Sequence, residues 1–108
     1  MIKKEKFEPE LQELARFARA ISHPARLAIL KYLAETRTCI SGDISGNIPL
    51  SRSTVSQHLS ELRDIGLIQG NIDGLRINYC LKGSSIKKYQ DMMEKFFELM
   101  DCEKEQCC

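Results

Sequence analysis

Three cysteines lie within the last seven residues of the chain: Cys102, Cys107 and Cys108. Soft ions select cysteine sulfur, and trivalent arsenic or antimony takes three thiolates. On a continuous helix, at about 100° per residue, Cys102 and Cys107 would point roughly 140° apart. The three sulfur atoms can therefore meet at one ion only if the tail unwinds or two chains share the ligands.

The cysteines leave other interpretations open. The tail could bind another soft metal, Cys107 or Cys108 could form a disulfide in response to an oxidant, or the tail thiols could have no role. Cys39 is either a further participant or a small buried apolar residue, and Cys80 is expected to face away from the core. Because five cysteines are an odd number for a disulfide framework, the sequence indicates reduced thiols in a cytoplasmic protein.

A second set of side chains suited to recognition lies between Ser51 and Ser60. It consists of short hydroxyls, one amide and one guanidinium: Arg52, Ser53, Thr54, Ser56, Gln57 and Ser60. Such a surface approaches phosphates without repulsion, Gln57 can pair with an adenine edge, and a helix N-terminus adds a positive end. The alternative is an ordinary solvated helix face with capping serines.

Length and composition narrow the classes of protein. The chain has 108 residues, 43% of them hydrophobic, and 16 basic against 15 acidic side chains. This suits one folded domain, with no apolar run long enough for a membrane span and no secretory signal at the N-terminus. No Ser-His-Asp order, paired buried carboxylates or glycine-rich phosphate loop is visible, which argues against an enzyme.

The elements that position these groups follow from hydrophobic spacing and capping residues. Helices are predicted over residues 9–21, 24–35, 41–45, 51–65 and 86–100, where Ser41, Ser51 and Gly83-Ser84-Ser85 serve as caps. Strands are predicted over 67–72 and 75–81, joined by a hairpin turn at Asp73-Gly74. This order predicts a mostly helical α+β fold, a winged helix-turn-helix over residues 1–101, followed by a cysteine-rich tail over 102–108.

Three stretches resemble the ArsR/SmtB family of metalloregulatory repressors. Ser51 to Ile68, SRSTVSQHLSELRDIGLI, is similar to its recognition-helix signature S-x-S-x-V-S-x-H-L-x-x-L-R-x-x-G-L-V. His23 to Leu30, HPARLAIL, resembles the opening of its second helix, and Gly74 to Leu81, GLRINYCL, resembles its wing strand. Together the resemblance covers about residues 10–100.

The resemblance implies a homodimeric repressor that binds double-stranded operator DNA. N- and C-terminal helices would form the dimer, so that two recognition helices enter successive major grooves about 34 Å apart. The 3-4 apolar spacing over residues 86–100 fits such a dimer seam, or alternatively packing within one subunit. The implied DNA-binding residues are Arg52, Ser53, Thr54, Ser56, Gln57, His58 and Arg76, with His58 either structural or facing DNA.

The wing departs from the family pattern. Residues 69–73, QGNID, carry no basic side chain and leave Arg76 as the basic wing residue. We therefore expect weak contact between the wing and phosphates and a modest dependence of DNA affinity on salt. The sparse charge also supports an alternative, a protein-interaction module with this fold that does not bind DNA.

The effector site differs among members of the family, and each type of site requires particular ligand residues at particular positions. The zinc type needs histidines on the last helix, but His23 and His58 lie elsewhere. The thiolate type needs C-x-C near Cys39, and the persulfide type needs a cysteine within residues 24–35; neither is present. The cysteine-rich tail resembles that of arsenic-responsive members, which have three thiols at the end of the last helix. The resemblance thus implies Cys102, Cys107 and Cys108 as ligands of As(III) or Sb(III), with no cofactor needed for folding.

Overall fold

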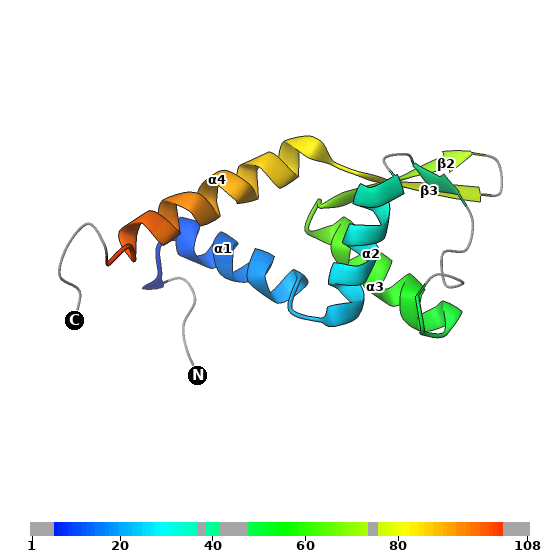
Figure 1. The fold of residues 1–108 in the computed structure, drawn as a ribbon, viewed down its shortest axis with the longest axis horizontal. Helices are drawn as coiled ribbons and strands as arrows, with labels where there is room; N and C mark the ends of the chain where they lie inside the picture. Colours follow the sequence, from blue (N-terminus) through cyan, green and yellow to red (C-terminus); the bar gives the residue numbers. More distant parts are fainter. Residues whose placement is uncertain (1–5, 37–38, 42–47, 74–75, 103–108) are drawn as a thin grey trace.

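The computed structural model describes residues 6–36, 39–41, 48–73 and 76–102, and within them four helices accompany a three-stranded sheet (Figure 1). The helices are α1 (Pro9–Ala20), α2 (Pro24–Thr36), α3 (Arg52–Asp64) and α4 (Gly83–Leu99), and the strands are β1 (Ile40–Ser41), β2 (Ile68–Asp73) and β3 (Arg76–Leu81). The predicted mostly helical α+β fold is confirmed. In the described ranges, no helix is both long and apolar enough to cross a membrane.

The sheet has the strand order β1-β3-β2, and both pairings are antiparallel. The hairpin pairs Ile68 with Leu81 at one end and Asp73 with Arg76 at the other. The short strand β1 was not predicted, because two residues are too few to show an alternating pattern. Ser41, expected to cap a helix, ends this strand instead, and the rest of that expected helix lies outside the described residues, as does Gly74.

The start of α4 also differs from the prediction. Its N-cap is Lys82, which makes no side-chain capping bond, while Ser84 and Ser85 lie inside the first turn. The backbone N–H of Lys82 donates to the carbonyl oxygen of Leu67 at 2.9 Å, which keeps Lys82 extended beside the end of α3. Gly66 ends that helix region with a φ of 86°, a left-handed conformation that glycine adopts without strain.

One hydrophobic core joins α2, α3, β2 and α4. Its buried members are Ile29, Leu33, Ile48, Val55, Leu59, Leu62, Leu67, Ile68 and Tyr89. The α3 contributions recur at helical spacing, so one face of that helix is buried and the opposite face is left to solvent. The core thereby fixes which side of α3 can meet a partner.

Helices α1 and α4 pack side by side and form an arm that extends away from the sheet (Figure 1). The rings of Phe17 and Tyr89 stack with centroids 4.6 Å apart. Glu13 accepts a hydrogen bond from Lys88 Nζ, with which it forms an ion pair, and the Tyr89 hydroxyl donates to the same carboxylate at 3.5 Å. These contacts hold the two helices together within one chain.

Candidate nucleic-acid interface

The N-terminal turn of α3 is fixed by serine and threonine hydroxyls. Ser51 is the N-cap, as predicted, and its Oγ accepts a hydrogen bond from the backbone N–H of Thr54 at 3.4 Å. The same Oγ lies 2.9 Å from Thr54 Oγ1 and 3.4 Å from Ser53 Oγ. The Thr54 N–H is one of the groups that a helix leaves without partners at its start, and Ser51 satisfies it.

The outer face of α3 carries the polar side chains that the sequence singled out. Arg52, Ser53, Ser56 and Gln57 are exposed, whereas Thr54 is half-buried beside Ser51. The buried residues Val55, Leu59 and Leu62 lie on the opposite side. The helix therefore presents one amide, one guanidinium and several hydroxyls outward from a rigid support.

His58, which the resemblance included in the DNA-binding set, lies on the buried side of α3 and not on this outer face. Only 8% of the residue is exposed, because it follows Val55 and precedes Leu59 on the buried side of α3. The Nε–H of Arg26 donates to His58 Nδ1 at 3.0 Å. His58 is therefore structural, the other alternative that its place in the sequence allowed.

Arg26 connects three elements at the base of α3. Besides binding His58, one of its terminal N–H groups donates to the carbonyl oxygen of Ala20 at 3.2 Å. The ring of His23 lies beside that of His58 with centroids 4.6 Å apart, and its Nδ1 accepts from the backbone N–H of Ala25 at 3.0 Å. The end of α1 and the start of α2 thus hold the recognition helix through Arg26.

This environment lowers the pKa of His58 below its ordinary value of 6.5. The first cause is burial, which disfavours the charged imidazolium, followed by the nearby His23 and Arg26, while Glu61 opposes the shift. A neutral imidazole is also what the contact requires, since only an unprotonated Nδ1 can accept the Arg26 hydrogen bond.

Several arginines gather at a hollow beside these residues. It has a volume of about 510 Å³, and its walls include Arg16, Arg19 and Arg26 together with Glu61 and Asp64. The two carboxylates offset much of the local positive charge. In the wing, Arg76 begins β3 opposite Asp73, while its side chain lies outside the described residues.

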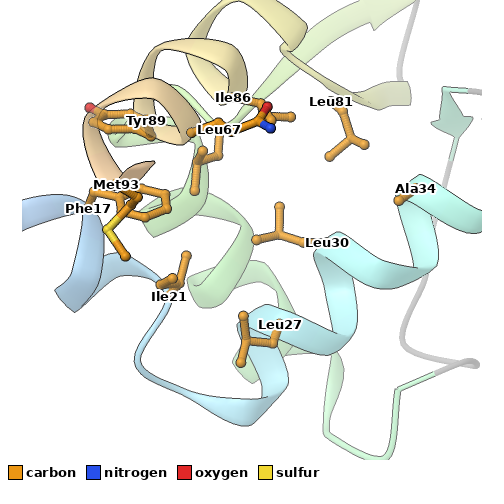
Figure 2. A pocket seen from close by; sticks show the side chains of 11 residues that line it. Phe17, Ile21, Leu27, Leu30, Ala34, Leu67, Leu81, Ile86, Tyr89 and Met93 are labelled. Atoms are coloured by element: carbon orange, nitrogen blue, oxygen red, sulfur yellow. The ribbon is translucent and has the colours of Figure 1, made fainter. Parts of the chain in front are cut away.

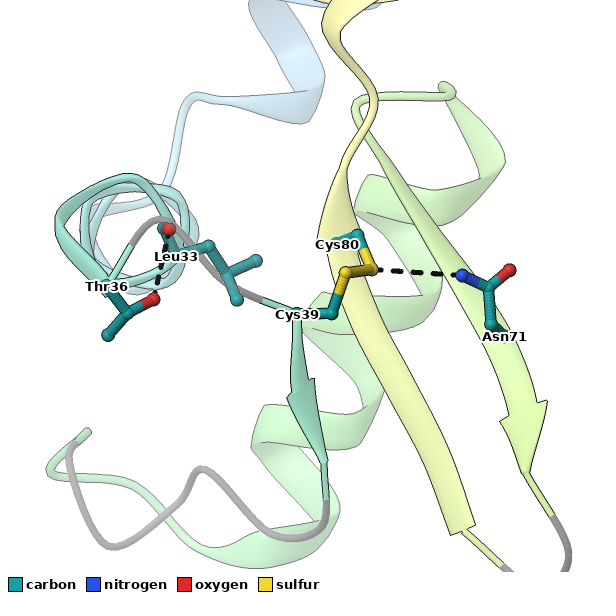
Figure 3. The surroundings of a disulfide bond; sticks show 5 residues. All are labelled: Leu33, Thr36, Cys39, Asn71 and Cys80. Carbon is teal, nitrogen blue, oxygen red and sulfur yellow. Dashed lines mark hydrogen bonds between the residues drawn. A yellow bond between two sulfur atoms is a disulfide. The ribbon is translucent and has the colours of Figure 1, made fainter.

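The structure pairs two cysteines that sequence reasoning left unassigned. Cys39 and Cys80 form a disulfide between the segment after α2 and strand β3 (Figure 3). The expectation of reduced thiols is therefore wrong for these two residues. Cys80, which was expected to face away from the core, is instead among the buried residues, with 7% of it exposed. The signal that could have found the pair is the register of β1, which the sequence did not reveal.

The predicted effector ligands are described only in part. Cys102 is exposed just beyond α4, and its Sγ lies 3.6 Å from the carbonyl oxygen of Met100. Cys107 and Cys108 lie outside the described residues. In the part of the chain that is described, no cluster of three or more His, Cys, Asp or Glu side chains could hold a metal ion.

An apolar groove separates the arm from α2 (Figure 2). Its volume is about 390 Å³. Its lining includes Phe17 of α1 and Ile21 just after that helix, Leu27 and Leu30 of α2, and Ile86 and Met93 of α4. Leu27 is exposed even though it points into this groove, so the groove is an uncovered apolar surface of the single chain.

Known proteins share the region that carries this geometry. The family described as "Bacterial regulatory protein, arsR family" matches residues 23–69, from the start of α2 into β2. The HTH-type transcriptional regulator YgaV of Escherichia coli (strain K12) is 37% identical over 75 residues, which are 69% of this chain and 76% of YgaV. The family match thus includes the whole of α2 and α3.

Solved structures agree over most of the chain. An ArsR-like transcriptional regulator from Rhodococcus sp. RHA1 has a TM-score of 0.71 at 28% identity, covering 86% of this chain and 87% of that one. The NMR structure of the cadmium metal-sensor CmtR from Mycobacterium tuberculosis has a TM-score of 0.55 at 36% identity, covering 68% and 76%. These relatives are transcription regulators rather than enzymes. The chain belongs to the arsR family of bacterial regulatory proteins, which are winged helix-turn-helix transcription regulators.

Proposed function

We propose that this regulator is a homodimeric repressor that binds operator DNA through α3 and is released by trivalent arsenic or antimony. The observation that carries the proposal is the division of α3 into two faces. Its inner face is fixed by the core and by Arg26, and its outer face exposes Arg52, Ser53, Ser56 and Gln57. A rigid helix with such a polar face is suited to the major groove.

Each exposed side chain has a separate task in this proposal. Gln57 reads an adenine edge, whereas Arg52 and the serine hydroxyls contact phosphates close to the positive helix N-terminus. Arg76 supplies the basic contact expected of the wing. Because these cationic groups are few, DNA affinity should depend on salt less steeply than in regulators with many phosphate contacts.

Dimerisation through the arm is supported by apolar surface that the single chain leaves uncovered. Exposed apolar side chains lie toward the outer ends of both arm helices: Phe7, Leu11, Phe97, Leu99 and Met100. Large apolar side chains left exposed by a single chain are candidates for a protein interface. A second copy packed along α1 and α4 would bury these side chains and set the spacing of the two α3 helices.

The proposed effector ligands are Cys102, Cys107 and Cys108. Cys102 is exposed at the end of the arm, so an ion held there would act on the helices that form the dimer. The relative CmtR is a cadmium sensor by name, which supports a soft-metal effector, and the three thiols favour arsenic or antimony. Couplings between effector and DNA are typically about 1–3 kcal/mol, and they are reciprocal.

Fluorescence anisotropy of labelled DNA from upstream of the protein's own gene tests the proposal. Tight binding followed by release at near-stoichiometric arsenite is the expected result. Release by cadmium but not arsenite would retain the repressor and change the effector. Absence of any salt-dependent binding would contradict the DNA-binding role and favour the protein-interaction module.

The tail assignment has its own variant. Replacing Cys107 and Cys108 together by Ser should leave DNA affinity unchanged and abolish release by arsenite. Gln106→Ser is a matched control in the same segment and should keep the full response. Arsenite release that persists in the double variant would contradict the assignment of these two ligands.

Sequence reading by α3 is tested with Gln57→Ala on operator and on random DNA. Loss of a paired base contact costs about 1–3 kcal/mol of discrimination, so binding to the operator should weaken much more than binding to random DNA. Arg52→Ala is the control and should weaken both by similar factors. Equal weakening in the Gln57 variant would move that residue to a phosphate-contacting role.

A further inference from the structure

The disulfide between Cys39 and Cys80 joins the segment after α2 to strand β3 (Figure 3). We propose that it is a reversible thiol–disulfide pair, in which Cys39 exchanges with small thiols such as glutathione and Cys80 is the resolving sulfur. Its control of DNA affinity rests on the DNA-binding function proposed above. The exchange chemistry itself does not depend on that function.

The register of the sheet places the two cysteines opposite each other. Strand β1 pairs Ile40 with Tyr79 and Ser41 with Asn78, so one further step along the same register brings Cys39 opposite Cys80. Their Cα atoms are 4.4 Å apart, a separation typical of directly opposed residues that exchange no backbone hydrogen bonds. The same fold therefore holds both sulfur atoms within bonding reach when the bond is reduced.

The surroundings of the two sulfur atoms are unequal. Cys39 is exposed, whereas Cys80 is buried, so an external thiolate can reach Cys39 and not Cys80. The side-chain amide of Asn71 on the neighbouring strand donates to Cys80 Sγ at 3.8 Å. Attack at Cys39 makes Cys80 the sulfur that leaves, and the Asn71 donor offsets part of the cost of placing negative charge on a buried sulfur.

The exchange follows from this asymmetry. A glutathione thiolate attacks Cys39 Sγ, a mixed disulfide forms, and the bonding electron pair leaves on Cys80 Sγ beside the Asn71 amide. Cys80 then takes up a proton from water. A second glutathione thiolate attacks the glutathione sulfur of the mixed disulfide and releases Cys39 and one glutathione disulfide, so two electrons reduce the pair. The reverse sequence, with glutathione disulfide as oxidant, restores the bond.

The pair controls how firmly the recognition helix is joined to the wing. The chain between Cys39 and Cys80 contains α3, β2 and nearly all of β3, so the disulfide closes a covalent ring around the DNA-reading half. Without it, β1 retains only a two-residue pairing with β3. The oxidised form is thus pre-organised, and reduction should weaken operator binding by about 5-fold or more.

Exchange of the Cys39–Cys80 pair with glutathione is tested in a variant of the whole chain in which Cys102, Cys107 and Cys108 are all replaced by Ser. After incubation in glutathione buffers of graded redox poise, thiols are trapped by alkylation and counted by mass spectrometry. A pair that passes between oxidised and reduced forms within the range of glutathione buffers is expected. A bond that stays intact in excess reduced glutathione is structural and overturns the proposal.

Single variants in the same background test the roles of the two sulfur atoms. Cys80→Ser should accumulate a glutathione adduct on Cys39, whereas Cys39→Ser should form little adduct on buried Cys80. Asn71→Ala should slow reduction of the pair, while Gln90→Ala, a change to an exposed amide of α4, should leave the rate unchanged. Equal adduct formation on both cysteines would contradict the assigned roles.

DNA anisotropy on the same background separates the two proposals. Tighter operator binding by the oxidised form, lost in the Cys39→Ser variant, is the expected result. Identical affinity of both redox forms would overturn control of DNA binding by the pair. Loss of DNA binding in both forms while glutathione exchange persists would instead contradict the proposed function and leave the exchange chemistry standing.

Discussion

Helices α3 and α4 both carry apolar residues at helical spacing, yet the two sets of residues differ in how far the chain buries them. In α3, Val55, Leu59 and Leu62 are all buried in the core. In α4, Tyr89 is the buried member, while Phe97, Leu99 and Met100 toward its end are exposed. The apolar face of α3 is covered by its own chain, whereas the apolar residues at the end of α4, where Phe97 and Leu99 point about 200° apart, are not.

The difference shows what hydrophobic periodicity can and cannot establish. It identifies the face of a helix that prefers an apolar neighbour, and it does not say whether that neighbour belongs to the same chain. For α3 the partner is the core, which leaves its polar face outward. For the end of α4 the partner proposed here is a second copy. Four changes test this comparison.

The largest effect is expected from truncating matched leucines on the two helices. Leu62 is 0% exposed and Leu99 is 83% exposed. Leu62→Ala should lower the free energy of unfolding by about 2–5 kcal/mol, because it removes packed methyl groups and leaves a cavity. Leu99→Ala should leave the fold of a single chain nearly unchanged. Urea denaturation of both variants measures the difference.

Repeating the leucine experiment at several protein concentrations distinguishes a weaker dimer from a less stable single chain. If Leu99 lies in a dimer interface, its replacement should weaken the dimer in analytical ultracentrifugation, and the resulting loss of stability should depend on concentration. A Leu99→Ala variant with unchanged self-association would remove Leu99 from the interface. A Leu62→Ala variant with unchanged stability would contradict the burial that separates the two helices.

The next effect concerns the polar support of α3. Arg26→Ala removes the hydrogen-bond donors to His58 Nδ1 and to the carbonyl oxygen of Ala20. An unsatisfied buried acceptor costs about 1–3 kcal/mol, so we expect that loss in the free energy of unfolding. Arg19→Ala, a change to an exposed arginine of α1, is the control. If both variants lose the same small free energy of unfolding, Arg26 does not connect α1, α2 and α3 as described.

Periodic elements with clear ends could be predicted from the sequence. The predicted bounds of α1, α2 and α3 lie within about two residues of those observed, because apolar spacing and the residues Pro24, Ser51 and Gly66 act locally. The hairpin strands were predicted for the same reason. Strand β1 was missed because two residues become a strand only through pairing with β3.

The candidate site was predictable only in part for a related reason. The outer face of α3 could be listed from composition, but His58 could not be assigned, since its partner Arg26 lies 32 residues earlier in the chain. The Cys39–Cys80 bond likewise depends on a register between distant segments. Contacts that join residues far apart in sequence leave no local pattern, and both surprises are of this kind.

The dependence of stability on pH tests the buried, neutral state of His58 on the inner face of α3. His58 has its pKa lowered below 6.5 in the folded protein, so the unfolded chain binds more protons in this range. Stability should therefore be full above about pH 6.5 and should fall as the pH drops through the lowered pKa. Denaturation over a series of pH values measures the slope. His58→Gln should flatten that slope, and an unchanged slope in this variant would assign the effect to other groups.

The smallest effect is expected in the arm, where two ion pairs can be compared. Glu13 and Lys88 join α1 to α4, whereas Lys87 and Asp91, 3.2 Å apart, lie on α4 alone. The hydrogen bond from Lys88 holds the pKa of Glu13 below its ordinary value of 4.5. The contribution of Glu13 is therefore present at neutral pH and is lost as the pH falls below that value. Because Lys88 is largely exposed, salt screens the pair and its contribution stays small.

In urea denaturation at low salt, Glu13→Gln should lower stability slightly more than Asp91→Asn, since only the first change also loosens the contact between helices. If the two variants lose the same amount, the pair does not hold the arm together, and the Phe17–Tyr89 stack and the proposed dimer must do so.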